Sequence, residues 1–366
     1  MQKSKRSFFS ILVTIFTITV LILYGMVCLV PFVPISILWI FNLPGLIFPF
    51  LFFILLILTL IYFIVRSKWK WKCLVVLLLG VQQLAAVFPL NLSHSWTNEK
   101  RVNSFRILSW NVSSWDIANF TTKKGNTFHE PMMNFIKAQN ADILCFQEFF
   151  ECTDPKIVPS FIQPFKEMGY AYFYFAPNSF TVSGKFQTGL ALFSKYPIND
   201  TTFFKKITAT HSEGFIYTDV HINSKIIRLF NMHLESVGFI SDDYKALGKV
   251  KGSRTILKKL ISSYTIRNKQ ALDLKSLITQ SPFPTIVCGD MNDIPNSTVY
   301  FTVKGSMQDT FIHKGVWPGR TFRFISPTLR IDYILAHKDF KIIQFVTGSQ
   351  IFSDHLPIIT DIQFKN

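Results

Sequence analysis

The feature that most restricts the fold of this chain is a long run near its N-terminus, from Ser7 to Val65, that contains no charged residue. A helix that crosses a bilayer needs about 20 apolar residues, so this run is long enough to cross more than once. Proline and glycine punctuate its middle at "LVPFVPIS" and "FNLPGLIFPF", and these residues break or kink helices. We therefore expect one membrane span at about 9–30 and a second at about 44–65.

A third apolar segment, "CLVVLLLGVQQLAAVFPL" at about 73–90, is shorter and contains Gln82 and Gln83. Glutamine side chains are costly in hydrocarbon but not forbidding, so this segment either spans the membrane or lies along its surface. A cleaved signal peptide is the alternative for the first apolar run, but that run is too long and no small-residue cleavage site follows it promptly. We expect residues 1–95 to form a membrane anchor with about three transmembrane helices.

Basic residues set the expected orientation of this anchor. They cluster at Lys3, Lys5 and Arg6 and again in "RSKWKWK", whereas the turn between the first two spans has none. Cytoplasmic loops carry an excess of Lys and Arg, so both basic clusters should face the cytoplasm. If the third segment lies on the surface, the rest of the chain stays in the cytosol. If it spans, the protein is an integral, multi-pass membrane protein with an extracytoplasmic C-terminal domain, and this is the arrangement we expect.

The remainder of the chain, residues 101–366, reads as one soluble domain with a basic charge balance. Of the 38 Lys and Arg residues eight lie before residue 101, and of the 22 Asp and Glu residues only Glu99 does. An excess of positive charge suits an anionic substrate or a lipid headgroup surface, and general solubility explains it equally well. The five cysteines show no CxxC or Cys/His spacing that indicates zinc.

Short apolar strand-like segments alternate with turn clusters in this domain, interrupted by helix-like stretches at 129–140 and 257–280. About ten strands with few helices fit two packed sheets covered by helices better than one doubly wound sheet. Strand ends from packed sheets can converge on one cleft, where these polar residues would hold a hard cation beside two imidazoles. The polar residues at the strand ends are Asn111, Glu148, His233, Asp290, Asn292, Asp332, Asp354 and His355.

The motifs "SWN", "QE", "HL", "GDMN", "IDYI" and "SDHLPI", in this order over roughly 103–364, resemble the endonuclease/exonuclease/phosphatase superfamily. Its members include pancreatic-type deoxyribonucleases, abasic-site endonucleases, neutral sphingomyelinases and inositol polyphosphate 5-phosphatases. The resemblance implies a four-layer α/β/β/α sandwich, with two packed mixed β-sheets flanked by helices, as the catalytic domain. It also implies Mg²⁺-dependent phosphoester hydrolysis, but it leaves the phosphoester open because this fold hosts many substrates.

Phosphoester hydrolysis needs a placed water, neutralisation of the charge on the phosphoryl oxygens, and a proton or cation for the leaving oxygen. Glu148 is the expected Mg²⁺ ligand, with Asn111 beside it and Asp354 as a further oxygen donor; Mn²⁺ could substitute. Asp290 is expected to orient or deprotonate the water. Asn292, on the same face if the strand continues, would donate an N–H to the developing oxyanion.

The two histidines complete the expected site. His355 would hydrogen-bond a phosphoryl oxygen or serve as an acid, and Asp332 would fix its tautomer and raise its pKa. His233 resembles the second histidine of deoxyribonuclease-like and sphingomyelinase-like members. Arg267 and Gln270, in a helix-like segment, match a pattern often seen in the superfamily, although exposed helix surface is an adequate explanation for them.

The sequence thus predicts a membrane-anchored, Mg²⁺-dependent phosphoester hydrolase. Its expected partners are the lipid bilayer and an anionic phosphoester, which is either a phospholipid headgroup or a nucleic acid. The short tether after Leu90 favours a lipid, because it keeps the domain at the bilayer. The basic balance suits a nuclease, although we find no helix-turn-helix, zinc finger or basic stripe with interleaved aromatic residues. The alternative is a catalytically inactive, membrane-tethered domain that binds a phosphorylated or anionic partner.

Overall fold

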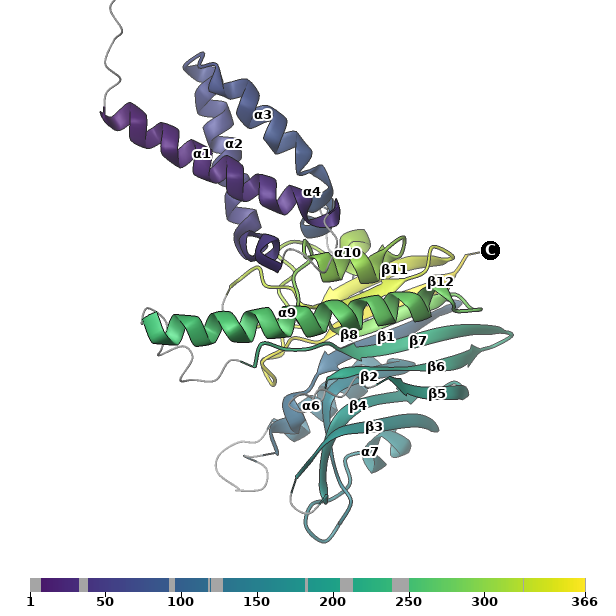
Figure 1. The fold of residues 1–366 in the computed structure, drawn as a ribbon. Coiled ribbons are helices and arrows are strands. Elements are labelled where there is room, and N and C mark those ends of the chain that lie inside the picture. Colours follow the sequence, from purple (N-terminus) through teal and green to yellow (C-terminus); the bar gives the residue numbers. More distant parts are fainter. Residues whose placement is uncertain are drawn as a thin grey trace, which may run out of the picture. The chain divides into compact units, whose positions relative to one another are not determined.

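A computed structural model gives the fold, shown as a ribbon in Figure 1. It describes residues 8–32, 39–91, 96–117, 119, 128–181, 184–204, 213–238, 250–324 and 326–365. The chain divides into two compact units. The helical unit comprises Met1–Phe88 with Ile294–Phe301, and the sheet unit comprises Pro89–Asp293 with Thr302–Asn366.

The helical unit is built from apolar helices that share a small core of their own. Two of its stretches, Phe8–Phe32 and Asn42–Ile64, are long and apolar enough to cross a membrane, and they coincide with the two spans expected first. Its elements are α1 (Phe8–Leu29), the 3₁₀ turns η1 (Val30–Phe32) and η2 (Trp39–Ile47), α2 (Phe48–Ile64), α3 (Trp69–Leu79) and α4 (Val81–Val87).

The third expected span differs from a single straight helix. α3 and α4 are apolar enough to cross a membrane only as a pair, and they are bent by 53° at a break. Gly80 lies at this break and packs so closely on Tyr24 that a Cβ would collide with its ring. Gln83 is fully buried, and its amide donates to the carbonyls of Val27 and Cys28. Carbonyls in the last turn of a helix lack partners within the helix, so α1 offers acceptors that make this glutamine tolerable.

The sheet unit contains two six-stranded sheets. Sheet A consists of β1 (Ser104–Asn111), β2 (Ile143–Cys152), β3 (Tyr172–Thr181), β4 (Phe186–Ser194), β11 (Phe340–Thr347) and β12 (Ile358–Phe364), in the order β11-β12-β1-β2-β4-β3. Sheet B consists of β5 (Ile198–Phe204), β6 (Gly214–Ile222), β7 (Lys225–His233), β8 (Thr285–Asp290), β9 (Gln308–Asp309) and β10 (Asp332–Ala336), in the order β5-β6-β7-β8-β10-β9. Both sheets are mixed, because β1 and β2 are parallel, β7 and β8 are parallel, and the other pairs are antiparallel.

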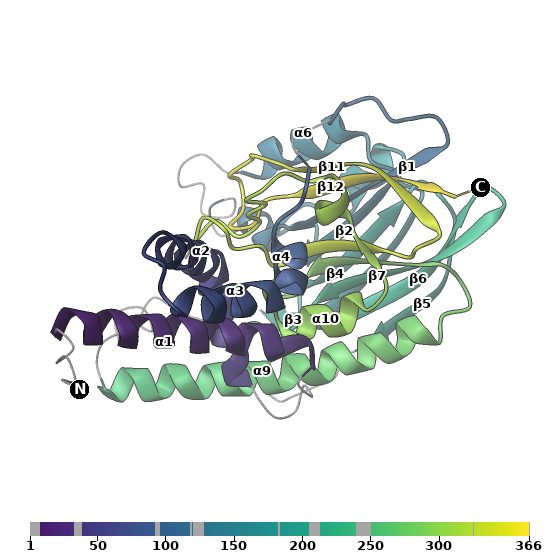
Figure 2. The ribbon, with the colours of Figure 1, turned by 90° about the horizontal axis from the view of Figure 1, so that it is seen from above.

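Helices cover the two sheets on their outer faces. Figure 2 shows α6 on the side of sheet A and α9 on the side of sheet B, with both sheets between them. The expected four-layer α/β/β/α sandwich is therefore confirmed, and α6 and α9 correspond to the two helix-like stretches of the sequence. The helical elements that the structure describes after residue 100 include η3 (Ser113–Asp116), α6 (His129–Gln139), α7 (Gln163–Glu167), α9 (Val250–Thr279), α10 (Thr298–Lys304) and α11 (Thr310–Lys314).

Among the described residues, two hydrophobic clusters join the two sheets to each other and sheet A to its helices. The first lies between the sheets and includes Ile107 of β1 and Leu229 of β7, both fully buried. The second joins the outer face of sheet A to α6 and α7 and includes Leu108 and Phe165. Successive side chains of a strand point to opposite faces, so Ile107 and Leu108 enter different clusters. Burial on both faces explains why these strands read as continuous apolar runs.

Candidate active site

Three of the predicted site residues lie in one row across sheet B. His233 pairs with Asp290 in the parallel ladder of β7 and β8, and Asp290 pairs with Asp332 in the antiparallel ladder of β8 and β10. Side chains at paired positions of neighbouring strands point to the same face of the sheet. All three residues are buried, and Asp290 is completely inaccessible to solvent. The sheet therefore presents an imidazole and two carboxylates side by side.

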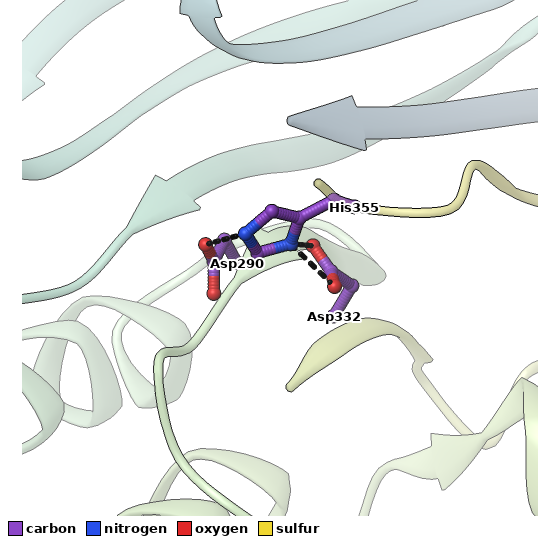
Figure 3. A group of neighbouring side chains, drawn as sticks. All are labelled: Asp290, Asp332 and His355. Carbon is purple, nitrogen blue, oxygen red and sulfur yellow. Dashed lines mark hydrogen bonds and ion pairs between the residues drawn. The ribbon is translucent and has the colours of Figure 1, made fainter. Parts of the chain in front are cut away.

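His355 joins this row from the segment that precedes β12. Its Nδ1 lies 3.0 Å from Asp332 Oδ2, and its Nε2 lies 3.6 Å from Asp290 Oδ2. Figure 3 shows the imidazole between these two carboxylates. The backbone is held as well, because the Trp110 indole N–H donates to the His355 carbonyl at 2.9 Å. Each ring nitrogen of His355 thus faces one carboxylate.

The pKa values of Asp290 and His355 are both raised above their ordinary values, for different reasons. Burial raises the pKa of Asp290 to about 6, and the positive charge of His355 opposes that rise. For His355, burial acts to lower the pKa, but the carboxylates of Asp332 and Asp290 outweigh it and raise the pKa to about 10. At neutral pH His355 is therefore protonated and Asp290 is mostly ionised, which places a proton donor beside a base.

Sheet A brings Asn111 and Glu148 to the same place. The Asn111 amide nitrogen lies 3.0 Å from Glu148 Oε1 and 3.3 Å from Asp290 Oδ2. His233 Nε2 lies 3.9 Å from Glu148 Oε1 and 3.7 Å from Asp290 Oδ2. Residues from both sheets therefore converge around the Asp290 carboxylate, as the strand-end pattern of the sequence indicated.

An irregularity in β2 directs Glu148 toward this site. The pairing of β2 with β4 changes register between Phe146 and Phe149, and Glu148 has φ of 51°. A left-handed backbone at a residue other than glycine costs about 1–3 kcal/mol, and bulges of this kind re-aim side chains at active sites. Beside the bulge, Gln147 donates to Asn231 of β7 at 2.7 Å, which links the two sheets through a buried hydrogen bond. The Glu148 side chain remains 39% exposed.

The turn after β8 departs from the expected continued strand. β8 ends at Asp290, and Asn292 has φ of 52°. Its backbone N–H donates to Asp290 Oδ1 at 2.8 Å, and its side-chain amide donates to the Leu234 carbonyl at 2.8 Å. The premise that Asn292 follows along the strand is wrong, because the Asp290 carboxylate stabilises a turn over the next two residues. Asn292 still lies beside Asp290. The position directly before Asp290 requires glycine. Gly289 has φ of 124°, and a Cβ there would collide with the Met232 carbonyl of β7.

The residues predicted to bind a cation are only partly brought together. The Asn111 amide nitrogen contacts Glu148, while the Asn111 oxygen accepts the Ser113 N–H at 3.1 Å. The accessible Glu148 carboxylate is thus the oxygen donor that a hard divalent cation accepts here. Asp354 accepts a hydrogen bond from its neighbour Ser353 at 3.0 Å. The single hydrogen of the Ser353 hydroxyl is shared with the Asn111 carbonyl, which lies 2.8 Å from Oγ. The structure therefore connects Asp354 to the pair through Ser353.

A second group of residues has the spacing of a metal site. One potential ligand atom from each of Asp290, Asp332 and His355 lies within 4.8 Å of the others. A histidine must be neutral to bind a metal ion, whereas the two carboxylates keep His355 protonated at neutral pH. A metal ion at this trio would therefore have to displace the proton of His355.

Arg267 and Gln270 of α9 contribute to the surroundings of the site, contrary to their interpretation as exposed helix surface. They are 1% and 2% exposed. Arg267 Nε donates to the Glu235 carbonyl at 2.7 Å, and Gln270 Oε1 accepts the Glu235 backbone N–H at 2.8 Å. Their i, i+3 spacing places them on one helix face, which is the sequence signal from which a shared partner can be inferred.

The sequence and the fold both resemble those of known proteins. The model of the Endonuclease/Exonuclease/phosphatase family matches residues 108–355, and a domain of unknown function (DUF8431) matches residues 6–87. No curated protein matches the sequence. Among solved structures, an endonuclease/exonuclease/phosphatase from Beutenbergia cavernae is similar with a TM-score of 0.53 and 15% identity, over 72% of this chain and 72% of that chain.

Two further solved structures share the fold. The catalytic domain of human Nocturnin, which contains a bound sulfate anion, has a TM-score of 0.50 and 17% identity over 73% of this chain and 97% of its own. A humanized D. rerio TDP2 has a TM-score of 0.50 and 15% identity over 71% of this chain and 99% of its own. At such identities the likeness establishes the fold alone. Because the family model covers more than half of the sequence, the chain belongs to the Endonuclease/Exonuclease/phosphatase family.

Proposed function

We propose that this chain is a membrane-anchored, divalent-metal-dependent phosphoester hydrolase. Proteins of its family are generally phosphoester hydrolases. The observation that supports the proposal most directly is the His355 imidazole between Asp332 and Asp290, with Asn111 linking Asp290 to Glu148. A charged donor, a base and an accessible oxygen ligand in one place are the groups that metal-assisted hydrolysis requires.

Asp290 is the proposed base for the attacking water. Its pKa of about 6 leaves it ionised at neutral pH while keeping its proton affinity close to the working pH, which is favourable for a general base. Its Oδ1 accepts the backbone N–H of Asn292, and its Oδ2 faces His355, His233 and Asn111. A water beside Oδ2 would therefore lie among the donors that orient it.

His355 is the proposed donor to the phosphoryl group. Asp332 holds one ring nitrogen and keeps the imidazole charged, so Nε2–H can donate to an oxygen on which negative charge grows. His233, whose Nε2 lies between Glu148 and Asp290, is the proposed second donor. Asn292 acts mainly on the loop, since its amide is already bonded to the Leu234 carbonyl.

Glu148 and Asn111, with Asp354 nearby, are the proposed ligands of Mg²⁺, for which Mn²⁺ can substitute. Such a cation would neutralise charge on the phosphoryl and leaving oxygens. The 39% exposure of Glu148 supports this assignment, because Mg²⁺ keeps several of its waters when it binds a protein. Asp290, Asp332 and His355 are left to handle protons.

The proposed substrate is an anionic phosphoester, from a phospholipid headgroup or a nucleic acid. The basic balance of residues 101–366 and the protonated His355 both support an anion. The solved Nocturnin domain binds a sulfate anion, which has the shape and charge of a phosphoryl group. Because the sheet unit begins at Pro89, directly after α4, a substrate at a membrane surface would be within reach.

The proposed location is an integral membrane protein with residues 1–95 as a multi-pass anchor and residues 101–366 outside the cytoplasm. Support comes from two apolar helices of sufficient length and from basic residues at both ends of that pair. A reporter fused after Asn366 tests this proposal. Activity of a reporter that works only in the cytoplasm would show that the α3 and α4 pair does not cross.

The central test is an assay of the full chain in detergent with Mg²⁺. Plasmid DNA, sphingomyelin and bis(p-nitrophenyl) phosphate are offered in parallel, and Asp290→Asn serves as the matched variant. We expect hydrolysis of at least one substrate by the natural chain and its loss in the variant. Equal hydrolysis by Asp290→Asn, or none by the natural chain on any substrate, would contradict the proposal.

A further inference from the structure

We propose that Arg267 and Gln270 of α9 are positioning residues. They would hold in place the two backbone segments that directly follow the site residues His233 and Asp290. One segment is Leu234–Glu235, directly after His233. The other is Asn292–Asp293, directly after Asp290. The inference rests on the proposed function, in which His233 and Asp290 act on the reacting groups.

In the first segment, both backbone polar groups of Glu235 are hydrogen-bonded to α9. Arg267 Nε donates to the Glu235 carbonyl at 2.7 Å, and Gln270 Oε1 accepts the Glu235 N–H at 2.8 Å. Gln270 Nε2 also donates to the Glu213 carbonyl at 3.1 Å, just before β6. Glu235 is two residues beyond His233, so little freedom remains for the backbone that carries this imidazole.

The second segment is held by the same arginine. Arg267 Nη1 forms an ion pair with Asp293 Oδ2 at 3.2 Å, and the two side chains are 2% and 1% exposed. The Asp293 carbonyl accepts a hydrogen bond from the Tyr333 hydroxyl at 2.8 Å. Asn292 links the segments directly through its bond to the Leu234 carbonyl. One guanidinium therefore contacts the continuations of two neighbouring strands, β7 and β8.

The charges around Arg267 agree with a positioning role. Burial raises the pKa of Glu235 to about 8, and the adjacent Glu213 carboxylate adds to the rise while Arg267 opposes it. Burial beside Glu213 thus favours the neutral form of Glu235, and the ion pair that Arg267 forms is with Asp293. A buried ion pair of this kind contributes little net stability compared with apolar packing. Its rigid, forked geometry instead fixes the relative placement of the groups it joins.

The test compares three variants of the full chain. Arg267→Lys keeps the charge but loses the fork, Gln270→Leu keeps the volume but loses both hydrogen bonds, and Arg106→Lys is the control. Arg106 also forms a completely buried ion pair, with Asp361 at 2.6 Å, but it lies at the opposite end of β1 from Asn111. The control therefore carries a similar cost in stability without touching the two segments.

The kinetic readout separates positioning from general loss of structure. With the phosphodiester that the natural chain hydrolyses, we expect Arg267→Lys and Gln270→Leu to lower kcat by about 10- to 100-fold, the scale of a small misplacement of reacting groups. Apparent Mg²⁺ affinity should not change, because Glu148 and Asn111 belong to sheet A. Arg106→Lys should lower Tm and leave kcat of the folded protein unchanged. A kcat in Arg267→Lys equal to that of the control would overturn the proposal.

A double-mutant comparison identifies the route of the effect. Arg267→Lys combined with Asn292→Ala should lower kcat by less than the product of the single effects, since both residues hold the same two segments. Arg267→Lys combined with Asn111→Ala should give the full product. If the fold-losses in kcat multiply fully in both double variants, Arg267 does not act through these segments.

A measurement independent of activity completes the test. Hydrogen exchange followed by mass spectrometry reports the Glu235 amide, which Gln270 protects, and the backbone at 290–293. Faster exchange there in Arg267→Lys and Gln270→Leu, but not in Arg106→Lys, supports the proposal even if no substrate is hydrolysed, an outcome that would contradict only the proposed function. Unchanged exchange at both segments overturns it.

Discussion

Sheet A and sheet B build their halves of the site in different ways. Sheet B aligns His233, Asp290 and Asp332 by regular pairing of three neighbouring strands, and it buries all three. Sheet A presents Glu148 from a bulge with a left-handed backbone, and it leaves that carboxylate partly exposed. The regular half thus holds charges whose positions must not change, and the irregular half holds the one that can exchange its partners with solvent.

This difference has an energetic basis. A strand ladder fixes each residue through many hydrogen bonds to both neighbours, and buried carboxylates acquire shifted pKa values that suit proton transfer. A bulge interrupts the ladder and costs free energy, but it can direct a side chain outward. In the proposed division of labour, sheet B and His355 handle protons, while Glu148 and Asn111 hold the cation. Each prediction below tests one half against the other.

The largest expected effect comes from removing the cation that Glu148 and Asn111 of sheet A are proposed to bind. Excess EDTA should abolish hydrolysis, because Glu148 and Asn111 offer oxygen ligands suited to a hard cation whose charge the reaction needs. Activity should return when Mg²⁺ or Mn²⁺ is added beyond the chelator, and initial rates measure both steps. Full activity in EDTA would remove the role assigned to sheet A.

Asp290→Asn and His355→Ala test the buried half. Each should lower kcat by about 10² or more while KM changes much less, because both residues act on charge that develops in the transition state. Circular dichroism and Tm should show that each variant remains folded. Near-normal turnover in Asp290→Asn would show that the base has been misassigned.

Asp332→Asn tests whether Asp332 of sheet B and His355 act together as a pair. Without this carboxylate the pKa of His355 falls and its ring loses the partner of Nδ1, so a slower rate should accompany a displaced pH profile. The double variant Asp332→Asn/His355→Ala should cost little more than His355→Ala alone. Independent, multiplying losses measured for the two single variants would argue against the pair.

The smallest expected effect is the pH dependence of the natural chain. Asp290 must be ionised, so the rate should fall about tenfold per pH unit once the pH drops below the Asp290 pKa of about 6. His355 must be protonated, so the rate should fall again as the pH rises through about 10. The logarithm of kcat/KM against pH shows both limbs. A rate that keeps rising above pH 10 would contradict a protonated His355.

The sequence predicted the convergence of the site because that convergence depends on strand ends, which apolar runs and turn residues mark clearly. Asn111, His233, Asp290 and Asp332 lie where their strands end or begin. The motif identified Glu148, but the sequence did not predict the bulge that turns this side chain toward the site. Inserting one residue into a strand hardly changes its apolar pattern, so the pattern does not reveal a bulge.

Two other features were hidden for related reasons. The turn at Asn292 depends on a hydrogen bond that the Asp290 carboxylate makes to the backbone, and the sequence is equally compatible with a continued strand. The burial of Arg267 and Gln270 depends on polar partners in distant segments, Glu235 and Asp293, which no local pattern shows. A polar helix face reads as solvent-exposed until the groups that it meets are known.

The position of β12 has a consequence for how the protein is made. β12 is the last described strand in the sequence, yet it lies inside sheet A, between β11 and β1. Until β12 has been synthesised, β1 and β11 each keep an unpaired strand edge. Such edges are prone to pair with strands of other chains. His355 lies three residues before β12, so its imidazole reaches the site together with the strand that completes the sheet. If the proposed function holds, a nascent chain would stay inactive and prone to aggregation until β12 has been translated and has paired with β11 and β1.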